Sequence, residues 1–426
     1  MGVVAVFLGT LALGLGLAVP IGLVLIFCAV ALMFYMGNFN ETIIVQQMVM
    51  GTNNGSLLAI PFFMLAGELM AKGGLSIRIV NFANLVVGRF KGGLGYVVIL
   101  SSILFAGLSG SAVADAAALG GILIPIMKEN NYNAERATGL VCSGAVIAPI
   151  IPPSIPMIVL ATGVGVSVGK LFMAGIVPGI LLGMALMIVW KRIVLKDGYT
   201  DTIRYEKGEG RKVVKKSLLA LFMPIMIVGG IRLGVFTPTE AGAFAAVYAF
   251  IISVFVYREL PPKKIVEVFV ESARSTGIVM FIVAAASAVA WLITIAQIPT
   301  KIVQLLGPLV EHPVILLLTI NLFLFIMGMV MDLTPNLLIF GPILFPVVIA
   351  AGIDPIFFGV IMVLNLTIGL ITPPVGTILY LGCRVGGVTF EKLVKGILPF
   401  LLTEIIVLLI LTLFPQIILF PLELFY

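Results

Sequence analysis

Charged residues, histidine and cysteine are all scarce in this sequence, and each scarcity excludes a class of protein. Charged residues make up 10% and hydrophobic residues 61%, with a mean hydropathy of +1.25. A water-soluble domain could not keep that much apolar surface out of solvent. The one histidine and the three isolated cysteines (His312, Cys28, Cys142, Cys383) provide neither a disulfide framework nor a metal-dependent catalytic cluster. The composition therefore predicts a polytopic membrane protein that is not an enzyme and needs no cofactor.

The basic residues are grouped in short polar stretches between apolar runs. A net charge of +6 would favour nucleic-acid binding in a soluble chain, but in a membrane protein these groups indicate cytoplasmic loops. We assign five clusters to the cytoplasm: Lys72–Lys91, Lys128–Arg136, Lys191–Lys216, Arg258–Lys264 and Arg384–Lys395. Since the first basic residue is Lys72, the N-terminus lacks the charged leader of a signal peptide, and we expect it to be retained.

Keeping all five clusters inside limits how often the chain can cross. The pattern predicts about ten transmembrane helices and places both termini in the periplasm; the spans are 3–18, 20–36, 56–72, 137–162, 171–190, 217–234, 238–257, 276–295, 355–385 and 397–420. Segments 93–127 and 313–350 are different. Each contains two short apolar arms, and an arm of about 16 residues rises about 24 Å, less than the hydrocarbon core of about 30 Å. We therefore predict two re-entrant helical hairpins, the first turning at Gly107–Ala112.

The two halves of the chain repeat one plan. Aligning Pro125 with Pro346 gives an offset of 346 − 125 = 221, and the same offset superposes both prolines of the pairs at 152–153 and 373–374, and Gly107 on Gly328. The sequence predicts a first repeat at 1–190, a basic cytoplasmic linker at 191–216 and a second repeat at 217–426. With the hairpins opening to opposite sides, the repeats have inverted topology, an architecture typical of secondary transporters.

The Pro-Pro pairs interrupt two of the predicted spans, 137–162 and 355–385. Proline removes a backbone donor and clashes with the preceding turn, and in hydrocarbon the freed polar groups would be unsatisfied. Such breaks are tolerated where the backbone faces a cavity or an ion. We expect both breaks and both hairpin tips to line such a place.

Several stretches resemble one transporter family. "GLSGSAVADAAALGGILIP", "GVFTPTEAGAFAAVYAF", "NLTIGLITPPVGTILYL" and "IPFFMLAGELM" are similar to the large membrane subunit of tripartite ATP-independent periplasmic (TRAP) transporters, the DctM-like family. The resemblance covers nearly the whole chain. It implies a sodium-driven importer of a small organic anion of the C4-dicarboxylate or sialic acid type, located in the inner membrane and moving as an elevator. It also implies two partners, a small four-helix membrane subunit and a periplasmic substrate-binding protein.

Resemblance and position together suggest the substrate contacts: Ser111 at the first tip, Ser154 after the first proline pair and Asp332 at the second tip. A carboxylate near the midplane costs about 2.5 to 3.5 kcal/mol, so Asp332 is expected to be functional. It would suit a sugar acid such as sialic acid better than a plain dicarboxylate. Ser109 and Ser111 could instead cap the second arm of the hairpin, and the role of Asp115 stays open.

Two sodium sites are expected at the breaks, where helices release carbonyl oxygens that suit a hard cation. The second site would use Gly328, Gly369, Thr372 and Val375; subtracting 221 gives Gly107, Ala148, Ile151 and Ser154 for the first, with a hydroxyl from Ser109 or Ser111. Glycine at 107 and 328 would allow close backbone approach or a positive φ. The alternative is that these glycines only ease helix packing.

Other readings stay open beside these. In "TPTE", Thr237, Pro238 and Glu240 favour a capping box over a ligand role for the glutamate. An ABC-type permease would need larger cytoplasmic loops, and a channel would not need two broken-helix repeats. The nearest alternative function is a stand-alone sodium-coupled anion symporter of the divalent-anion family.

Overall fold

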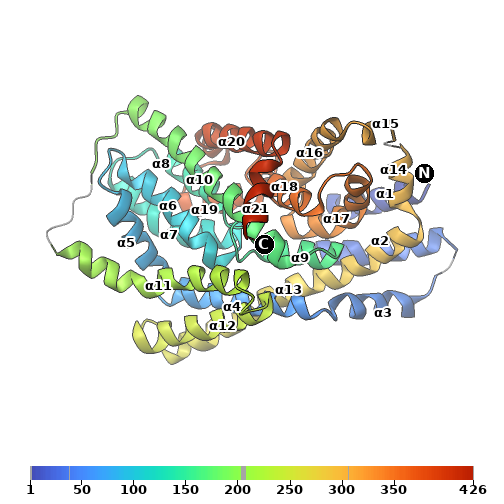
Figure 1. Cartoon of the computed structure of the whole chain (residues 1–426), viewed down its shortest axis with the longest axis horizontal. Coiled ribbons are helices and arrows are strands. Elements are labelled where there is room, and N and C mark those ends of the chain that lie inside the picture. Colours follow the sequence, from blue (N-terminus) through green and yellow to red (C-terminus); the bar gives the residue numbers. More distant parts are fainter. Residues whose placement is uncertain (1, 38, 203–207, 306, 426) are drawn as a thin grey trace.

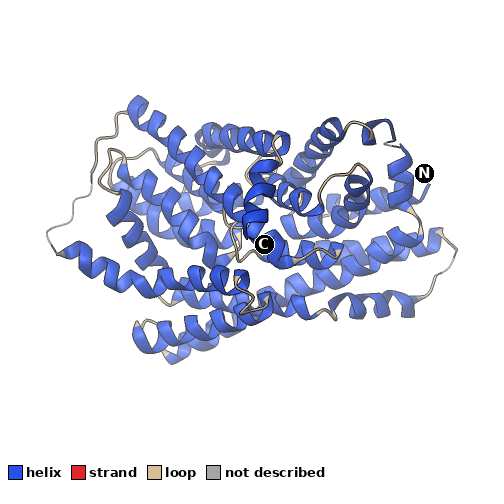
Figure 2. Ribbon diagram, viewed as in Figure 1, coloured by secondary structure: helices blue, strands red, loops and turns tan. Residues whose placement is uncertain are grey.

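The computed structural model describes residues 2–37, 39–202, 208–305 and 307–425, and all regular structure in these ranges is helical (Figure 2). Within these ranges, eight helices are long and apolar enough to cross a membrane, judged by length and composition alone, and six shorter apolar helices span 10–17 residues. The predicted fold class, an all-helical polytopic membrane protein, is confirmed.

The first half of the chain contains two hairpin arms and the first broken helix. Its elements are α1 (Gly2–Gly16), α2 (Ile21–Tyr35), α3 (Glu41–Thr52), η1 (Gly55–Leu58), α4 (Ala59–Lys72), α5 (Leu75–Val87), α6 (Gly93–Ser109), α7 (Ala112–Glu129), α8 (Ala134–Ala145), α9 (Ile155–Val164) and α10 (Val168–Asp197).

The second half also contains two hairpin arms and a broken helix. Its elements are α11 (Glu209–Arg232), α12 (Pro238–Ile251), η2 (Ile252–Val256), α13 (Pro262–Ile295), α14 (Ile298–Leu305), α15 (Gly307–Val310), α16 (Pro313–Val330), α17 (Leu333–Ala350), α18 (Pro355–Gly369), α19 (Thr377–Gly386), α20 (Phe390–Leu413) and α21 (Gln416–Phe425).

Helix ends recur at the offset of 221 between the halves. Helices α6 and α16 end at 109 and 330, α7 and α17 begin at 112 and 333, and the N-caps of α8 and α18 lie at 133 and 354; each difference is 221. Asn133 and Asp354 both cap through a side-chain oxygen, which accepts from the amides of Arg136 and Phe357. The chain therefore builds a hairpin followed by a broken helix twice.

Two groups of helices are visible in Figure 1. Helices α4, α11, α12 and α13 run along the lower edge of the view, with α2 and α3 beside α13, whereas the hairpins and the broken helices lie above them. Helix α4 packs on α12 and α13, and in the upper group α8 packs on α7 and α20, α9 on α17, and α18 on α16. Contacts between the groups include those of α4 with α6 and α9, of α11 with α6, and of α13 with α17.

The start of the first hairpin is anchored by a buried tryptophan. The indole N–H of Trp190, on α10, donates to the carbonyl of Gly92 at 2.9 Å. A Cβ at Gly95 would lie 1.9 Å from the Trp190 ring, so only glycine lets α6 pass this closely. Helix α6 is therefore fixed against α10 at its first turn.

Several elements differ from the predicted spans. Helices α3, α5, α14, α15 and α21 were not predicted, and α13 begins at Pro262 rather than at 276. The added part of α13 carries Lys263, Lys264, Glu267, Glu271 and Arg274, so its low hydropathy indicated a loop although the helix continues through it. The predicted linker at 191–216 consists of the end of α10 and the start of α11, and its residues 203–207 lie outside the described part of the chain.

Candidate functional site

The two hairpin tips meet at a pair of adjoining cavities of about 370 and 510 Å³. The smaller one is lined by both tips, including Ser111 and Asp332, and by Pro149 and Leu370 beside the two helix breaks. Both cavities share lining residues from the first hairpin, α9, α4 and α13: Met64, Ser111, Val113, Ile155 and Ser275. The structure thus places two of the three predicted substrate contacts, Ser111 and Asp332, on one cavity.

Three helices begin at the smaller cavity. Its lining includes the first residues of α7, α9 and α17, namely Ala112, Ile155 and Leu333. The N-terminus of a helix presents unpaired amides and the positive end of the helix dipole, which together form an anion-binding arrangement. No lysine or arginine lines either cavity among the described residues. An anion bound here would rely on backbone amides and helix dipoles.

A chain of hydrogen bonds within the first tip holds its shape. The Ser111 hydroxyl caps α7 by accepting from the Ala114 amide at 3.4 Å. The Ser109 hydroxyl accepts from the Ser111 amide at 3.2 Å and donates to the buried carboxylate of Asp115. Ser111 therefore caps the second arm, the role that stood as the alternative to substrate contact, and Asp115 acts as a brace for the tip.

The second tip is held by an amide that the sequence analysis missed. The side-chain amide of Asn336, fully buried, donates to the carbonyls of Met327 at 3.3 Å and of Met331 and Asp332 at 3.1 Å. Asn336 lies 336 − 115 = 221 residues after Asp115, so both tips are braced from the same position of the second arm. Asp332 itself makes no capping hydrogen bond and is exposed to the cavity.

Ser154 is placed differently from the other two predicted substrate contacts. It is fully buried, its hydroxyl donates to the Pro149 carbonyl at 2.6 Å, and the same oxygen accepts from the Met157 amide at 3.2 Å. It does not line either cavity, although Pro149 and Ile155 on either side do. In this structure its hydroxyl closes the first break and caps α9.

The second predicted sodium site brings a hairpin tip against a helix break. A Cβ on Gly369 would lie 2.5 Å from the carbonyl carbon of Gly328, so the two backbones are in direct contact. The Gly376 amide donates to the Met329 carbonyl at 3.4 Å, which joins the far side of the break to the tip. The Thr372 hydroxyl lies in the break and donates to the Ile368 carbonyl at 2.8 Å.

The first predicted sodium site has the same kind of contact. A Cβ on Gly107 would lie 3.5 Å from the Pro152 carbonyl oxygen and 3.0 Å from Pro224 of α11. The closest approach is made by Gly110, which adopts a φ of +59° and whose Cβ would lie 2.3 Å from the Pro153 carbonyl oxygen. Positive φ in this tip therefore belongs to Gly110 rather than to Gly107.

Carbonyl oxygens are free at both breaks. Among the described residues, no hydrogen bond reaches the carbonyls of Ala148, Ile151, Thr372 or Val375. The part of the chain that the structure describes also contains no group of three or more His, Cys, Asp or Glu side chains suited to a metal. Neutral backbone oxygens are consequently the ligands that these breaks offer to a cation.

The walls opposite the tips come from residues that the sequence analysis did not single out. Helix α4 contributes Met64 and Glu68, and α13 contributes Ser275, Ile278 and Val279. The carboxylate of Glu68 lies 3.7 Å from the ammonium of Lys72. The sequence did contain an indication of these two residues, since Met64 and Glu68 belong to "IPFFMLAGELM", one of the segments that carry the family resemblance.

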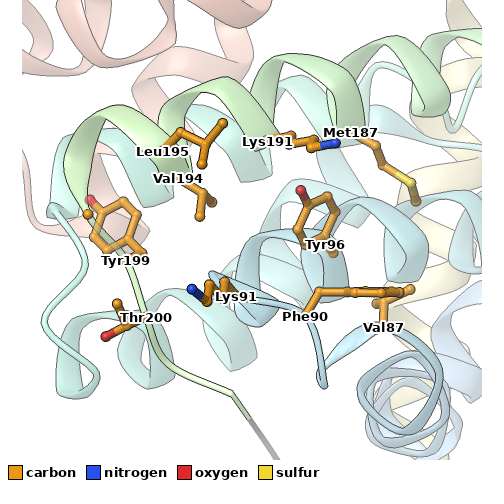
Figure 3. Close-up of a pocket in the computed structure, with 11 residues that line it drawn as sticks. Val87, Phe90, Lys91, Tyr96, Met187, Lys191, Val194, Leu195, Tyr199 and Thr200 are labelled. Carbon is orange, nitrogen blue, oxygen red and sulfur yellow. The ribbon is translucent and has the colours of Figure 1, made fainter.

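A third cavity, of about 580 Å³, is larger but contains none of the predicted site residues. Figure 3 shows its lining, in which Lys91, Tyr96, Lys191 and Tyr199 surround an otherwise mainly apolar space between the start of α6 and the end of α10. No helix break or hairpin tip reaches it. Size alone therefore does not identify the site.

Glu240 has the structural role that its sequence context favoured. Its amide donates to the Thr237 hydroxyl at 3.3 Å and its carboxylate accepts from the Thr237 amide at 2.8 Å, which completes a capping box at the start of α12.

Comparison with known proteins identifies relatives over the whole chain. Residues 8–417 match the model of the "Tripartite ATP-independent periplasmic transporter, DctM component" family. The chain is 45% identical to the 2,3-diketo-L-gulonate TRAP transporter large permease protein YiaN of Escherichia coli, covering 99% of each chain. It is 39% identical to the sialic acid TRAP transporter large permease protein SiaM of Vibrio cholerae, covering 95% of each. The YdaH transporter of Alcanivorax borkumensis has a similar fold, with a TM-score of 0.64 at 15% identity over 88% of this chain and 87% of that one.

Proposed function

The chain belongs to the family of TRAP transporter large membrane subunits, and from this premise we propose that it imports a small organic anion by coupling its entry to sodium. The observation that carries the proposal is the cavity between the hairpin tips. Three helix N-termini open into it, and the two breaks beside it offer free carbonyls. The first arrangement favours an anion and the second a hard cation.

The polar tips account for how an anion could bind without a basic side chain. The amides at the starts of α7, α9 and α17 would hold a carboxylate, with Ser111 beside it. Asp332 would repel a second carboxylate but can accept from hydroxyl or ammonium groups. A sugar acid of the sialic acid type therefore suits the cavity better than a C4-dicarboxylate.

Sodium would bind at the two junctions of tip and break. We assign Gly328, Gly369, Thr372 and Val375 to one site, and Gly107, Ser109, Ala148 and Ile151 to the other. Direct contact between Gly328 and Gly369 supports the site in the second half of the chain, because an ion bound there would hold the second hairpin tip against the second helix break. Movement of the tips would then depend on the ion.

The repeated hairpins and broken helices are proposed to move as one body against α4, α11, α12 and α13. The cavities support this, because their walls come from both groups. In this proposal the chain lies in the bacterial inner membrane with both termini in the periplasm. A small four-helix membrane subunit accompanies it, and a periplasmic binding protein delivers the substrate.

Uptake into proteoliposomes tests the proposal. The chain is reconstituted with its small subunit and its binding protein and supplied with a panel of sugar acids and dicarboxylates, with an inward sodium gradient or with potassium in its place. We expect uptake of one class of organic acid under the sodium gradient alone. Uptake that is equal in potassium would refute sodium coupling, and full uptake by the chain on its own would favour a stand-alone symporter of the divalent-anion family.

A further inference from the structure

Helix α20 carries a buried carboxylate that has no counter-charge within the described residues. Glu404 is 0% exposed, and neither of its carboxylate oxygens has a hydrogen-bond partner there. None of the ion pairs of the structure includes it. An ionisable side chain inside a membrane protein that is neither paired nor exposed is a candidate functional group.

Two buried hydroxyls lie at neighbouring positions of α8, which packs on α20. Ser143, on α8, is next to the Glu404 carboxyl and interacts with it without an aligned hydrogen bond. Ser102, on α6, points at the adjacent Gly144, where a Cβ would lie 2.4 Å from the Ser102 hydroxyl oxygen. Both serines are fully buried, and their hydroxyls likewise have no partner in the described part of the chain. Glycine at 144 is what allows the α6 hydroxyl to reach α8.

The second half of the chain fills the corresponding place with neutral amides, which hydrogen-bond to one another and leave only the side-chain oxygen of Asn365 without a partner among the described residues. Asn365 is the counterpart of Gly144, since 365 − 144 = 221. Its amide donates to the carbonyl and side-chain oxygens of Asn321 at 2.9 Å, and the Asn321 amide donates to Thr412 at 2.8 Å. Thr412 also belongs to α20, which therefore packs against both clusters. The second half thus places amides here, whereas the first half places a carboxyl group and two hydroxyls that have no partner among the described residues.

We propose that Glu404, Ser143 and Ser102 form a further sodium-binding site inside the body that carries the hairpins. The three side chains supply a carboxylate and hydroxyl oxygens from three different helices, which suits a hard monovalent cation better than an uncharged occupant. The inference rests on the proposed sodium coupling and adds a site that uses none of the backbone carbonyls at the breaks.

The cluster lies farther from the first hairpin tip than the first proposed sodium site does, toward the Lys91 end of α6. Ser102 precedes Gly107 by five residues on α6, and Ser143 precedes Ala148 by five residues at the end of α8. Five residues of helix correspond to about 7.5 Å. An ion at Glu404 would therefore lie beneath the first tip, toward the Lys91 end of α6, and would travel with the body when it moves.

Equilibrium binding of radioactive sodium to the purified membrane complex tests the site. We expect Glu404→Gln to bind fewer sodium ions by one at saturation, because the amide keeps the size of the side chain and removes its charge. Ser143→Ala is expected to weaken the same class of sites by about tenfold, the effect of losing roughly 1.4 kcal/mol. Glu391→Gln, an exposed change in the first turn of the same helix, is the matched control and should bind as the wild type does.

The outcomes separate this inference from the proposed function. If the wild type binds sodium and Glu404→Gln binds the same number of ions, the carboxyl is a neutral structural group and the site is wrong. The same holds if Glu404→Gln changes only the pH dependence of uptake, which would make it a proton site. If the wild type binds no sodium, sodium coupling itself fails. Should Glu404→Gln not yield a monodisperse protein, an unchanged sodium affinity in Ser143→Ala would by itself refute the site.

Discussion

At the scale of single residues, Ser111 and Asp332 occupy matching positions with different freedom. They are 332 − 111 = 221 residues apart, and each is the N-cap of the second arm of a hairpin. The Ser111 oxygen accepts from the helix, whereas the Asp332 carboxylate makes no capping bond and faces the cavity. Asp332 is therefore the side chain at the tips with the most capacity left for a substrate.

Substitution of these two residues tests the substrate site. Asp332→Ala and Ser111→Ala are both expected to lower the apparent affinity of uptake, Asp332→Ala by about 10- to 100-fold because a hydrogen bond to a charged group contributes about 1.5 to 3 kcal/mol. The measurement is concentration-dependent uptake in proteoliposomes. Asp354→Asn is the control, since it also removes the charge of an N-cap aspartate, Asp354 caps α18 and asparagine caps equally well. Wild-type transport by both alanine variants would show that the substrate binds elsewhere.

Thr372 provides a separate test of the second sodium site. Thr372→Ala removes a hydroxyl at the break and is expected to raise the sodium concentration for half-maximal uptake by about tenfold, as for a ligand worth roughly 1.4 kcal/mol. The affinity of the binding protein for substrate should not change. Thr367→Ala is the matched control, because Thr367 makes the same kind of bond to its own helix, at 2.6 Å, within α18. An unaltered sodium dependence in Thr372→Ala and in Gly328→Val would remove this site.

The role of a residue could be predicted where its hydrogen-bond partner lies close by in the sequence. It could not be predicted where the partner is distant in the sequence. Glu240 could be assigned to a cap because its partner lies three residues away, and the cap formed by Ser111 could be named for the same reason as the alternative to substrate contact. Asn336 and Glu404 were missed, since nothing in their neighbouring sequence indicates which carbonyls or hydroxyls surround them in the fold. Ser154 was expected at the cavity from its place after the proline pair, but its hydroxyl turns back to Pro149.

At the scale of elements, the hairpins and breaks could be predicted because glycine and proline punctuate them. The arms of the second hairpin, at 313–330 and 333–350, fill the predicted range of 313–350. Amphipathic and charged helices were not predictable from hydropathy, as the first part of α13 and the separate helices α3 and α5 illustrate. Helix α3 packs against α13, and α13 also contributes to the wall of the cavity opposite the hairpin tips.

Gly110 tests whether the contact between the first tip and the first break is needed. Gly110→Ala combines a positive φ with a Cβ placed 2.3 Å from the Pro153 carbonyl oxygen, so the tip or the break must shift. We expect strongly reduced uptake and a weaker effect of sodium on thermal stability. Gly121→Ala, on α7 with nothing within 4 Å of the added Cβ, should transport normally. Equal uptake by both variants would mean that the tip does not need this approach.

At the scale of the whole molecule, the proposed inverted topology requires that the basic loops face the cytoplasm and that both termini face the periplasm. Asn38, which follows the predicted span 20–36, and Lys207, in the predicted linker 191–216, lie outside the described residues. The test therefore uses His312 and Lys212, both exposed. In a background with Cys28, Cys142 and Cys383 replaced, a cysteine at His312 should react with an impermeant thiol reagent from the periplasm. One at Lys212 should react only after permeabilisation. Labelling of Lys212→Cys from outside would overturn the assignment of basic loops to the cytoplasm.

The central claim is that the anion site lies on a body that moves against α4 and α13. Val113 on the first hairpin and Ser275 on α13 line both cavities, one on each side of the proposed sliding surface. In the same cysteine-free background, Val113→Cys and Ser275→Cys together should cross-link on oxidation. Cross-linked protein should no longer take up substrate, and reduction should restore uptake. Uptake at the wild-type rate by fully cross-linked protein would contradict the central claim.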